Sequence, residues 1–238
     1  MRGSPRIAGL RVVMSWPDSQ FAPQPPPRGR ARLRLAGLTG ISLVFGGVIA
    51  IVVATLAQQH APAPAASAAG DIGPGGAAKV LVLHQSVPVS VAIPAIGVQS
   101  RLLRLGRNQD GTMQVPDLTT SANEAAWYKY SVTPGQIGTA VIEGHVDSYQ
   151  GPAVFFRLGA LRPGNHINVT LADGITAVFR VTGVREYAKA EYPANTIYAP
   201  ADYAALRVIT CGGDFDAATG HYLSSVVVFA SLVSSSRQ

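Results

Sequence analysis

The sequence predicts a mainly β domain, folded as a closed or nearly closed β-barrel and preceded by one membrane-spanning helix. Three observations lead to this fold class. Short segments rich in Val, Ile, Phe and Tyr recur between Gly, Pro, Asn and Asp from about residue 80 to residue 233, long helical periodicity is missing there, and one uncharged apolar run comes before. About 150 residues of many short strands with few helices is typical of a barrel.

The strands are expected where apolar and β-branched residues cluster or alternate. These segments are 89–105, 138–146, 166–171, 176–187, 206–210 and 224–233. Asp173 and Gly174 form the pair that favours a tight hairpin turn, so the strands on either side of them should pair antiparallel. Two short helices are expected around residues 154–161 and 200–206.

The apolar run Leu35–Ala57 contains no charged residue. At about 1.5 Å per residue, a helix of this length covers roughly the 30 Å of a bilayer's hydrocarbon core. A cleaved signal peptide is the alternative, since residues 54–57, "ATLA", resemble a cleavage site. The run is longer than a signal peptide's usual apolar core and a long extension precedes it, so a transmembrane helix is the better prediction.

The net charge of +6 belongs to the N-terminal tail, residues 1–34. Seven arginines precede the span against the single acid Asp18, and removing them from the totals of 19 bases and 13 acids leaves 12 of each. An arginine excess beside a span marks the cytoplasmic side, which predicts a cytoplasmic N-terminus and an extracellular domain. The basicity is therefore explained by membrane topology, and we expect no nucleic-acid partner. The seven are Arg2, Arg6, Arg11, Arg28, Arg30, Arg32 and Arg34.

Residues 58–79 are rich in Ala, Pro and Gly and hold too few large apolar side chains to build a core. They are expected to form a flexible linker between the membrane and a globular domain at 80–238. Five scattered histidines and one cysteine give no metal-ligand spacing, so we expect no metal and no cofactor.

Cys211 is the only cysteine, placed after the apolar run "LRVIT" and before Gly212 and Gly213. An inert buried thiol is the ordinary explanation of a lone cysteine. The expected strand end and the two glycines, which leave room for a ligand's backbone, favour a surface site instead. His145 ends another apolar strand beside a glycine, so the two residues form a candidate pair of nucleophile and base.

These residues carry a resemblance to a known family. "ITCGG", together with "EGHVD", "GPAVFFRLGALRPG" and "GHYLSSVVVFA", resembles the sortase family of transpeptidases, and within it the class F type of actinobacteria. The similarity extends over Val89–Leu232. It implies an eight-stranded barrel and a cysteine transpeptidase that cuts a C-terminal sorting signal between Thr and Gly. The acyl group then passes to an amine of the cell wall.

The resemblance also implies roles for single residues. Cys211 matches the nucleophile and His145 the family histidine, about 65 residues upstream. Thr210 matches the residue before the cysteine, and with Gly212 it is expected to support the substrate or the oxyanion. A thiolate is a far better nucleophile than a thiol, and a histidine can protonate the departing amine and deprotonate the incoming one.

The sequence departs from the family at one position. The family has an arginine on the strand after the cysteine, where Leu223 and Ser225 stand here, and no arginine occurs between Arg207 and Arg237. Arg207 is the nearest substitute, on the same strand face as Cys211 but roughly 13 Å away at about 3.3 Å per residue. Arg185 is a weaker candidate, and the side chains of Ser224, Ser225 or His221 are further possible donors.

Three functions remain open at this point. The first is a membrane-anchored transpeptidase acting on secreted proteins with a Leu-Pro-x-Thr-Gly-like tail. The second is a catalytically impaired scaffold or peptide-binding module, supported by the missing arginine. The third is a cysteine protease, although papain-like enzymes place Cys before His in the chain and here His145 comes first.

Overall fold

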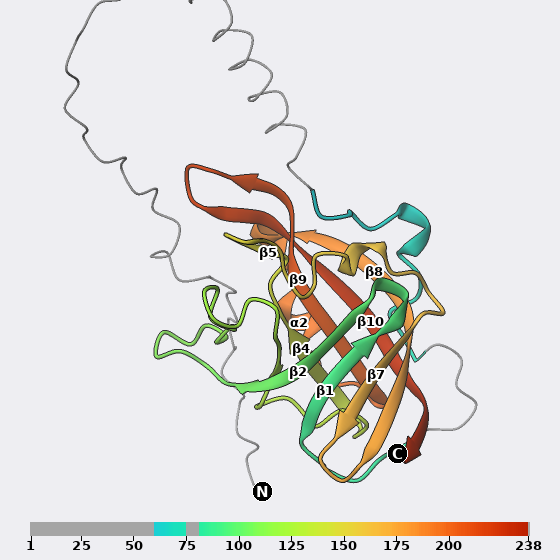
Figure 1. The fold of residues 1–238 in the computed structure, drawn as a ribbon. Helices are drawn as coiled ribbons and strands as arrows, with labels where there is room; N and C mark the ends of the chain where they lie inside the picture. The colour runs from blue at the N-terminus through green and yellow to red at the C-terminus, as the bar shows by residue number, and fades with distance from the viewer. Residues whose placement is uncertain (1–59, 75–80, 238) are drawn as a thin grey trace, which may run out of the picture. The chain divides into compact units, whose positions relative to one another are not determined.

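The structure is a computed structural model that describes residues 60–74 and 81–237, and its centre is a closed β-barrel (Figure 1). The barrel strands are β1 (Pro88–Ile93), β2 (Val98–Leu105), β3 (Ala125–Tyr128), β4 (Gly138–Glu143), β7 (His166–Leu171), β8 (Ile175–Ala188), β9 (Ala204–Asp216) and β10 (His221–Arg237). A separate two-stranded sheet pairs β5 (Asp147–Ser148) with β6 (Gly151–Pro152). The short helices are η1 (Ala66–Ala68), η2 (Pro94–Ile96), η3 (Leu158–Ala160), η4 (Lys189–Glu191) and α2 (Ala194–Ile197).

The strands follow one another around the barrel in the order β1-β2-β3-β4-β9-β10-β8-β7, and β7 closes it by pairing with β1. Two pairs are parallel, β2 with β3 and β4 with β9, and the others are antiparallel. The predicted closed, mainly β fold with eight barrel strands is therefore confirmed. The parallel pairing of β4 and β9 places the C-terminal ends of these two strands at the same end of the barrel.

The hairpin predicted at Asp173–Gly174 is also confirmed. Strands β7 and β8 pair antiparallel up to Thr170 opposite Thr176. Gly174 has a φ of 81°, which side-chain-bearing residues rarely adopt, so a glycine is needed at this turn.

The expected helices are largely wrong. In residues 154–161 only the three-residue η3 forms, and within 200–206 the chain enters β9 at Ala204. Ala204 and Leu206 alternate into the barrel interior, so burial against the other strands overrides the helical propensity of "AAL". The four-residue α2 forms earlier, at Ala194–Ile197.

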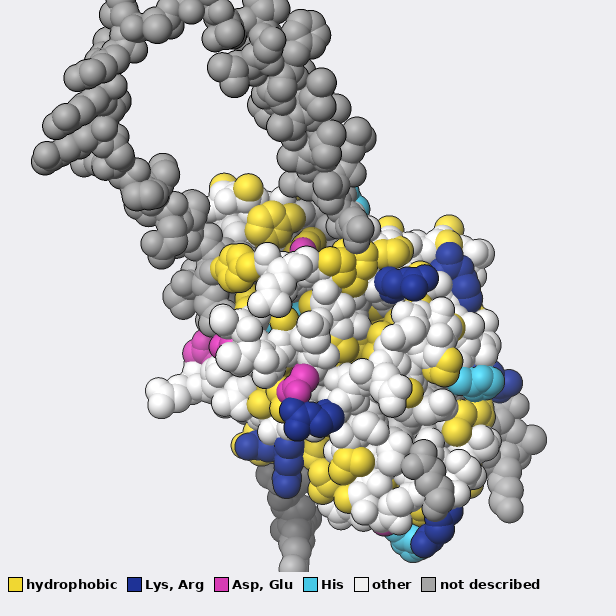
Figure 2. Space-filling model, viewed as in Figure 1, with side chains coloured by type: hydrophobic (Ala, Val, Ile, Leu, Met, Phe, Trp, Pro, Cys, Tyr) yellow, Lys and Arg dark blue, Asp and Glu magenta, His cyan; other side chains and the backbone are white. Residues whose placement is uncertain are grey.

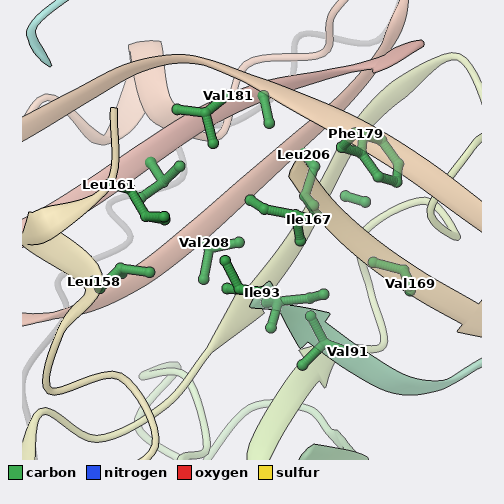
Figure 3. Packing of buried hydrophobic residues seen from close by; sticks show 14 of the residues in the cluster. Val91, Ile93, Leu158, Leu161, Ile167, Val169, Phe179, Val181, Leu206 and Val208 are labelled. Atoms are coloured by element: carbon green, nitrogen blue, oxygen red, sulfur yellow. The ribbon is translucent and has the colours of Figure 1, made fainter. Parts of the chain in front are cut away.

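The barrel interior is filled by aliphatic and phenyl side chains from every barrel strand except β2, whose Val98 and Leu102 pack at its margin (Figure 3). Phe155, Phe179 and Leu206 are fully buried there. No charged side chain belongs to this cluster among the described residues. The interior is thus an ordinary hydrophobic core, held by burial and close packing.

Residues 61–74 lie along the barrel and are called the N-terminal strap. They run beside β8, where Arg185 donates hydrogen bonds from Nε and Nη2 to the carbonyl oxygens of Ala69 and Gly70, each at 3.1 Å (Figure 1, cyan). Ala68 is fully buried in the interior core, and Tyr203 donates its hydroxyl to the Ile72 carbonyl. This part of the linker is therefore docked rather than free, because backbone carbonyls and small side chains suffice for the contact.

The predicted cytoplasmic tail 1–34 and transmembrane helix 35–57 lie outside the described residues. Within residues 60–74 and 81–237, no helix has the length and apolar character needed to cross a bilayer. The face of the domain in Figure 2 carries basic and acidic side chains in scattered positions, with hydrophobic side chains between them.

Candidate active site

The site lies on the outer face of four neighbouring strands, β4, β9, β10 and β8. Cys211 on β9 faces Ser225 on β10, which in turn faces Tyr187 on β8. Two residues back along the sheet, Ile209 lies between Glu143 on β4 and Val227 on β10. Side chains two residues apart on a strand share a face, so these rows form one continuous outer surface.

The parallel register of β4 and β9 brings Cys211 and His145 to the same end of the barrel. The last paired residues are Glu143 and Ile209, and the next backbone bond runs from Gly144 N to Ile209 O at 3.2 Å. Thr210 donates its hydroxyl to the Gly144 carbonyl at 2.8 Å. This bond holds the two segments together one residue beyond the last backbone pair. His145 and Cys211 each follow this last pair by two residues, so both lie just beyond the point where the pairing of β4 with β9 ends.

Strand β9 does not end at Cys211 as the sequence suggested. It continues to Asp216 and pairs with β10 as a hairpin that projects beyond the barrel (Figure 1, red). The barrel nevertheless ends at this level, because β4 pairs with β9 no further than Ile209 and residues 213–215 are exposed. Gly213, with a φ of 71°, lies at the register shift in this hairpin.

Cys211 is only 8% exposed. Burial raises its pKa to about 11, although Lys189, whose Nζ lies 3.7 Å from Sγ, lowers it. The carboxyls of Asp147 and Glu143 add to the increase. In this resting arrangement the thiol is protonated at neutral pH, and the nucleophilic thiolate is a minor form.

His145 is 5% exposed, and its Nε2 lies 2.6 Å from the carbonyl oxygen of Pro116. A carbonyl oxygen only accepts, so Nε2 carries the proton and Nδ1 is the basic nitrogen of the neutral ring. Burial lowers the pKa of His145, while Pro116, Asp147 and Asp117 raise it. The imidazole is therefore neutral at neutral pH, as is the thiol.

Asp147 is connected to the projecting hairpin. Tyr222 on β10 donates its hydroxyl to Asp147 Oδ2. Burial raises the pKa of Asp147, and the Tyr222 bond and His145 lower it. The carboxylate thus lies within electrostatic reach of both His145 and Cys211, between the histidine loop and the hairpin.

Lys189 is the cation at the thiol, and sequence reasoning missed it. It lies at the start of η4, in the connection between β8 and β9, two residues after the Tyr187 that faces Ser225. It stands 22 residues before Cys211, so no local spacing reveals the contact. The only hint in the sequence was the absence of the family arginine from the strand after Cys211. Another residue then has to supply the positive charge beside the thiol.

Arg207 lies on the same strand face as Cys211, as alternation predicted, but points elsewhere. Its guanidinium carbon lies 4.6 Å from the centre of the Phe229 ring, and Nη1 donates to the Leu206 carbonyl at 3.3 Å. The side chain is 5% exposed and interacts with Tyr203. These contacts hold the Arg207 side chain on the far side of Ile209 from Cys211. None of them involves the thiol.

The other predicted residues occupy supporting places. Thr210 fastens β9 to Gly144, and Gly212 is buried so tightly that an added Cβ would lie 2.7 Å from Val226. Arg185 is engaged by the N-terminal strap. Ser225 is fully buried opposite Cys211.

A short connection covers the outer face. Residues 189–201, called the cover segment, place Ile197, Tyr192 and Tyr198 over β4, β9 and β10. They pack with a second hydrophobic cluster, called the outer cluster: Met113, Tyr128, Val141, Ile197, Ile209, Val227 and Phe229. Beyond it, at the start of β4, a cavity of about 490 Å³ is lined by residues that include Thr139, Val141 and Tyr198.

The N-terminal strap approaches the thiol from the opposite side. Ala61, Pro62 and Ala63 leave a hollow of only about 10 Å³ beside Cys211. Pro62 lies directly over Gly159, where an added Cβ would stand 1.9 Å from the Pro62 carbonyl oxygen. The strap and the cover segment together account for the small exposure of the thiol.

No group of three or more His, Cys, Asp or Glu side chains with the geometry of a metal site occurs in the described part of the chain. The arrangement offers a thiol, an imidazole, a carboxylate and an ammonium group at one end of the barrel. These are the groups that nucleophilic acyl transfer requires.

A family model described as a sortase domain matches residues 91–233, more than half of the chain. No curated protein matches. Sortase A from Listeria monocytogenes is 17% identical with a TM-score of 0.47, over 65% of this chain and 92% of that chain. SrtA from Actinomyces oris is 20% identical with a TM-score of 0.47, over 68% and 89%. Sortase E1 from Streptomyces coelicolor, solved with a tripeptide in its active site, is 15% identical with a TM-score of 0.46, over 64% and 91%.

Proposed function

The chain belongs to the sortase family, and from that premise we propose that it is a membrane-anchored cysteine transpeptidase of the class F type. Its substrates are secreted proteins with a C-terminal Leu-Pro-x-Thr-Gly-like sorting signal. The acceptor is an amine of the cell wall. The N-terminus is cytoplasmic, Leu35–Ala57 crosses the membrane, and the barrel is extracellular.

One observation carries this proposal. The parallel pairing of β4 with β9 ends at Glu143 and Ile209, and two residues beyond that point each segment carries a residue that acyl transfer uses, His145 and Cys211. An accidental lone cysteine has no reason to lie next to a histidine loop, a carboxylate and a lysine at the open end of a barrel.

The chemistry follows from the order of the groups. The Cys211 thiolate attacks the carbonyl carbon of the substrate threonine, and a C–S bond forms. The C–N bond to glycine breaks, and the leaving amine takes a proton from the His145 imidazolium. The acceptor amine then attacks the thioester, gives a proton to His145 and displaces the thiolate, so the enzyme returns to its starting form.

Lys189 takes the place of the absent arginine. Its ammonium group, 3.7 Å from Sγ, favours the thiolate and lies where a negative charge develops on the attacked carbonyl. The buried resting site disfavours both the thiolate and the imidazolium. Substrate entry, by displacing the N-terminal strap from Cys211, therefore accompanies formation of the reactive pair.

Transpeptidation by the purified full chain tests the proposal. A Leu-Pro-x-Thr-Gly peptide and an excess of triglycine should give the ligated peptide, detected by mass spectrometry. Cys211→Ala and His145→Ala should give none. Hydrolysed peptide alone, with amine in excess, would favour a protease.

A peptide-binding scaffold is the second candidate, favoured by the protonated thiol and by the absence of an arginine on β10 near Cys211. It predicts that the wild-type chain and Cys211→Ala bind the peptide equally and that neither forms product. Equal behaviour of the two proteins would reject the enzyme.

A further inference from the structure

The direction of the N-terminal strap shows which end of the barrel the preceding chain approaches. Its first residues, Ala61–Ala63, lie beside Cys211 and line the small hollow there. Arg185 on β8 holds the middle of the strap, and Tyr203, just before β9 begins, donates its hydroxyl to the Ile72 carbonyl. The strap therefore starts at the end of the barrel that carries the thiol and runs toward the opposite end.

This direction limits the distance between the thiol and the membrane of the proposed function. The proposed span ends at Ala57, four residues before Ala61. Four residues of chain reach at most about 14 Å, because a fully extended residue covers about 3.5 Å. The end of the barrel that carries the thiol is therefore held close to the lipid surface.

The hairpin of β9 and β10 projects from the same end of the barrel (Figure 1, red). Strand β9 continues for five residues beyond Cys211, to Asp216. At about 3.3 Å per residue these five residues extend by up to roughly 16 Å. This reach matches the length of the connection to the span, so the hairpin can contact the lipid headgroups.

Large apolar side chains are exposed on this hairpin and beside it. Phe215 on β9 is 46% exposed, and Leu223 on β10 is 52% exposed. Tyr149, 67% exposed, lies between β5 and β6, a turn held to the hairpin by the bond from Tyr222 to Asp147. Figure 2 shows hydrophobic side chains at this end, in the upper part of the domain. Exposed apolar side chains gathered on a projecting element indicate an interaction surface, and these three are called the hairpin surface.

The charges of the hairpin determine the kind of membrane contact that it can make. Residues 212–223 contain Asp214 and Asp216 but no Lys or Arg, so attraction to anionic lipid is not the source of binding. Asp216 caps the turn of the hairpin, where it accepts hydrogen bonds from Ala218 N and Thr219 Oγ1. The contact must therefore come from apolar and aromatic side chains, which suit the boundary between headgroups and acyl chains.

We propose that the hairpin surface docks on the outer face of the lipid bilayer, with Phe215 and Leu223 inserted at the boundary between headgroups and acyl chains. This inference rests on the membrane anchor of the proposed function. Docking adds a second membrane contact to the anchor, and two contacts fix the orientation of the barrel. The barrel then keeps Cys211 close to the lipid surface when a substrate displaces the strap.

Tryptophan fluorescence of the full chain, reconstituted in phosphatidylcholine vesicles, tests the docking. Phe215→Trp places an indole on the hairpin, and Ile137→Trp places one at a similarly exposed position just before β4, at the opposite end of the barrel. Lipid brominated on its acyl chains should remove most of the emission that Phe215→Trp adds to the wild type. It should remove none of the emission that Ile137→Trp adds. Equal quenching in the two variants would overturn the docking.

A second substitution tests the contribution of Leu223. Leu223→Ser in the Phe215→Trp chain should lower the ratio of docked to undocked hairpin by about tenfold, as expected for one leucine side chain removed from water. The quenching should fall accordingly. Val82→Ser is the matched control at the opposite end of the barrel, where Leu83 N binds Gly135 O, and it should leave the quenching unchanged. Equal quenching in these two chains would reject the insertion of Leu223 and the docking with it.

Lipid charge separates apolar insertion from electrostatic binding. Quenching of Phe215→Trp should persist at high salt, and added phosphatidylglycerol should not strengthen it, because the hairpin carries acids and no base. Quenching that occurs only with phosphatidylglycerol and disappears at high salt would contradict the proposed insertion.

The docking and the proposed function fail differently. The quenching needs no turnover, so Phe215→Trp should behave in the same way with Cys211→Ala added, even if no peptide gives product and the transpeptidase is rejected. A chain that alkaline carbonate releases from the vesicles has no anchor, which rejects the anchor and the docking together. A chain that stays in the vesicles while Phe215→Trp remains unquenched rejects the docking alone.

Discussion

The two hydrophobic clusters of this molecule are built from the same strands but differ in what they contain. Alternate residues of β9 serve both, since Leu206 and Val208 point into the barrel and Arg207 and Ile209 point outward. Among the described residues, no buried charged side chain belongs to the interior cluster. The outer face, equally buried, also holds Glu143, whose carboxyl is unpaired, and Arg207, whose Nε has no hydrogen-bond partner.

This difference separates stability from function. Burial of apolar area stabilises the interior, and nothing there depends on a ligand. The outer face accepts buried polar groups that a core selected for stability would exclude. Substitutions in the interior should therefore change stability alone, and substitutions on the outer face should change activity with small or opposite effects on stability.

The largest expected effect is in the interior. Phe179→Ala should lower the free energy of unfolding by about 3 to 5 kcal/mol, because it removes a fully buried ring and leaves a cavity. Urea denaturation measures the loss. The milder Phe179→Leu serves if the alanine variant does not fold, and it should keep the wild-type activity per folded molecule. A large loss of activity in folded Phe179→Leu would contradict the separation.

Lys189→Ala should reduce kcat/KM by about a hundredfold, the usual effect of losing one group that stabilises an oxyanion. Lys189 lowers the pKa of Cys211, so without it that pKa rises above about 11 and alkylation by iodoacetamide slows at any lower pH. In the wild type the alkylation rate should rise about tenfold per pH unit up to about pH 11. Lys129→Ala is the matched control. If the alkylation rates of all three proteins depended on pH in the same way, Lys189 would not act on the thiol.

Glu143 should make the wild type less stable as pH rises. Its pKa is raised in the folded protein, so above about pH 4.3 the unfolded chain loses a proton that the folded chain keeps. The free energy of unfolding should then fall relative to Glu143→Gln by up to about 1.4 kcal/mol per pH unit, until the pKa of the folded state is reached. A constant difference between the two proteins from pH 4 to 8 would show that the carboxyl is not held protonated.

The smallest effect concerns the N-terminal strap. Gly159→Ala places a methyl group against the Pro62 carbonyl and should displace the strap from Cys211, which speeds alkylation of the thiol by a few fold. Gly97→Ala is the control, because it strains a turn at a φ of 71° but meets no neighbouring atom. Equal alkylation rates in the two variants would mean that the strap does not shield the thiol.

The fold was predictable because its signals are local. Alternation within β7 and β8, with Asp173 and Gly174 between them, specifies a hairpin from adjacent residues. The helix predicted at residues 200–206 was wrong because local propensity alone supported it. "PADYAAL" has helical propensity, yet its last residues enter β9, where they fill the barrel interior. Residues 61–74 lack large side chains and still dock, since their backbone carbonyls find Arg185 and Tyr203.

The site was predictable only where the chain carries family motifs. Cys211 and His145 could be named from sequence, but their approach depends on the parallel pairing of β4 and β9, which no spacing specifies. Lys189 comes from a connection whose path cannot be derived from its composition. Glu143 had a readable signal, as the only charged residue in the strand run "GTAVIEG".

Intact-protein mass spectrometry of the full chain with a Leu-Pro-x-Thr-Gly peptide tests the central claim most directly. The account predicts a mass increase equal to the acyl half of the peptide, located at Cys211, which disappears when triglycine is added and is absent in Cys211→Ala. An unmodified Cys211 after prolonged incubation with this peptide would contradict it.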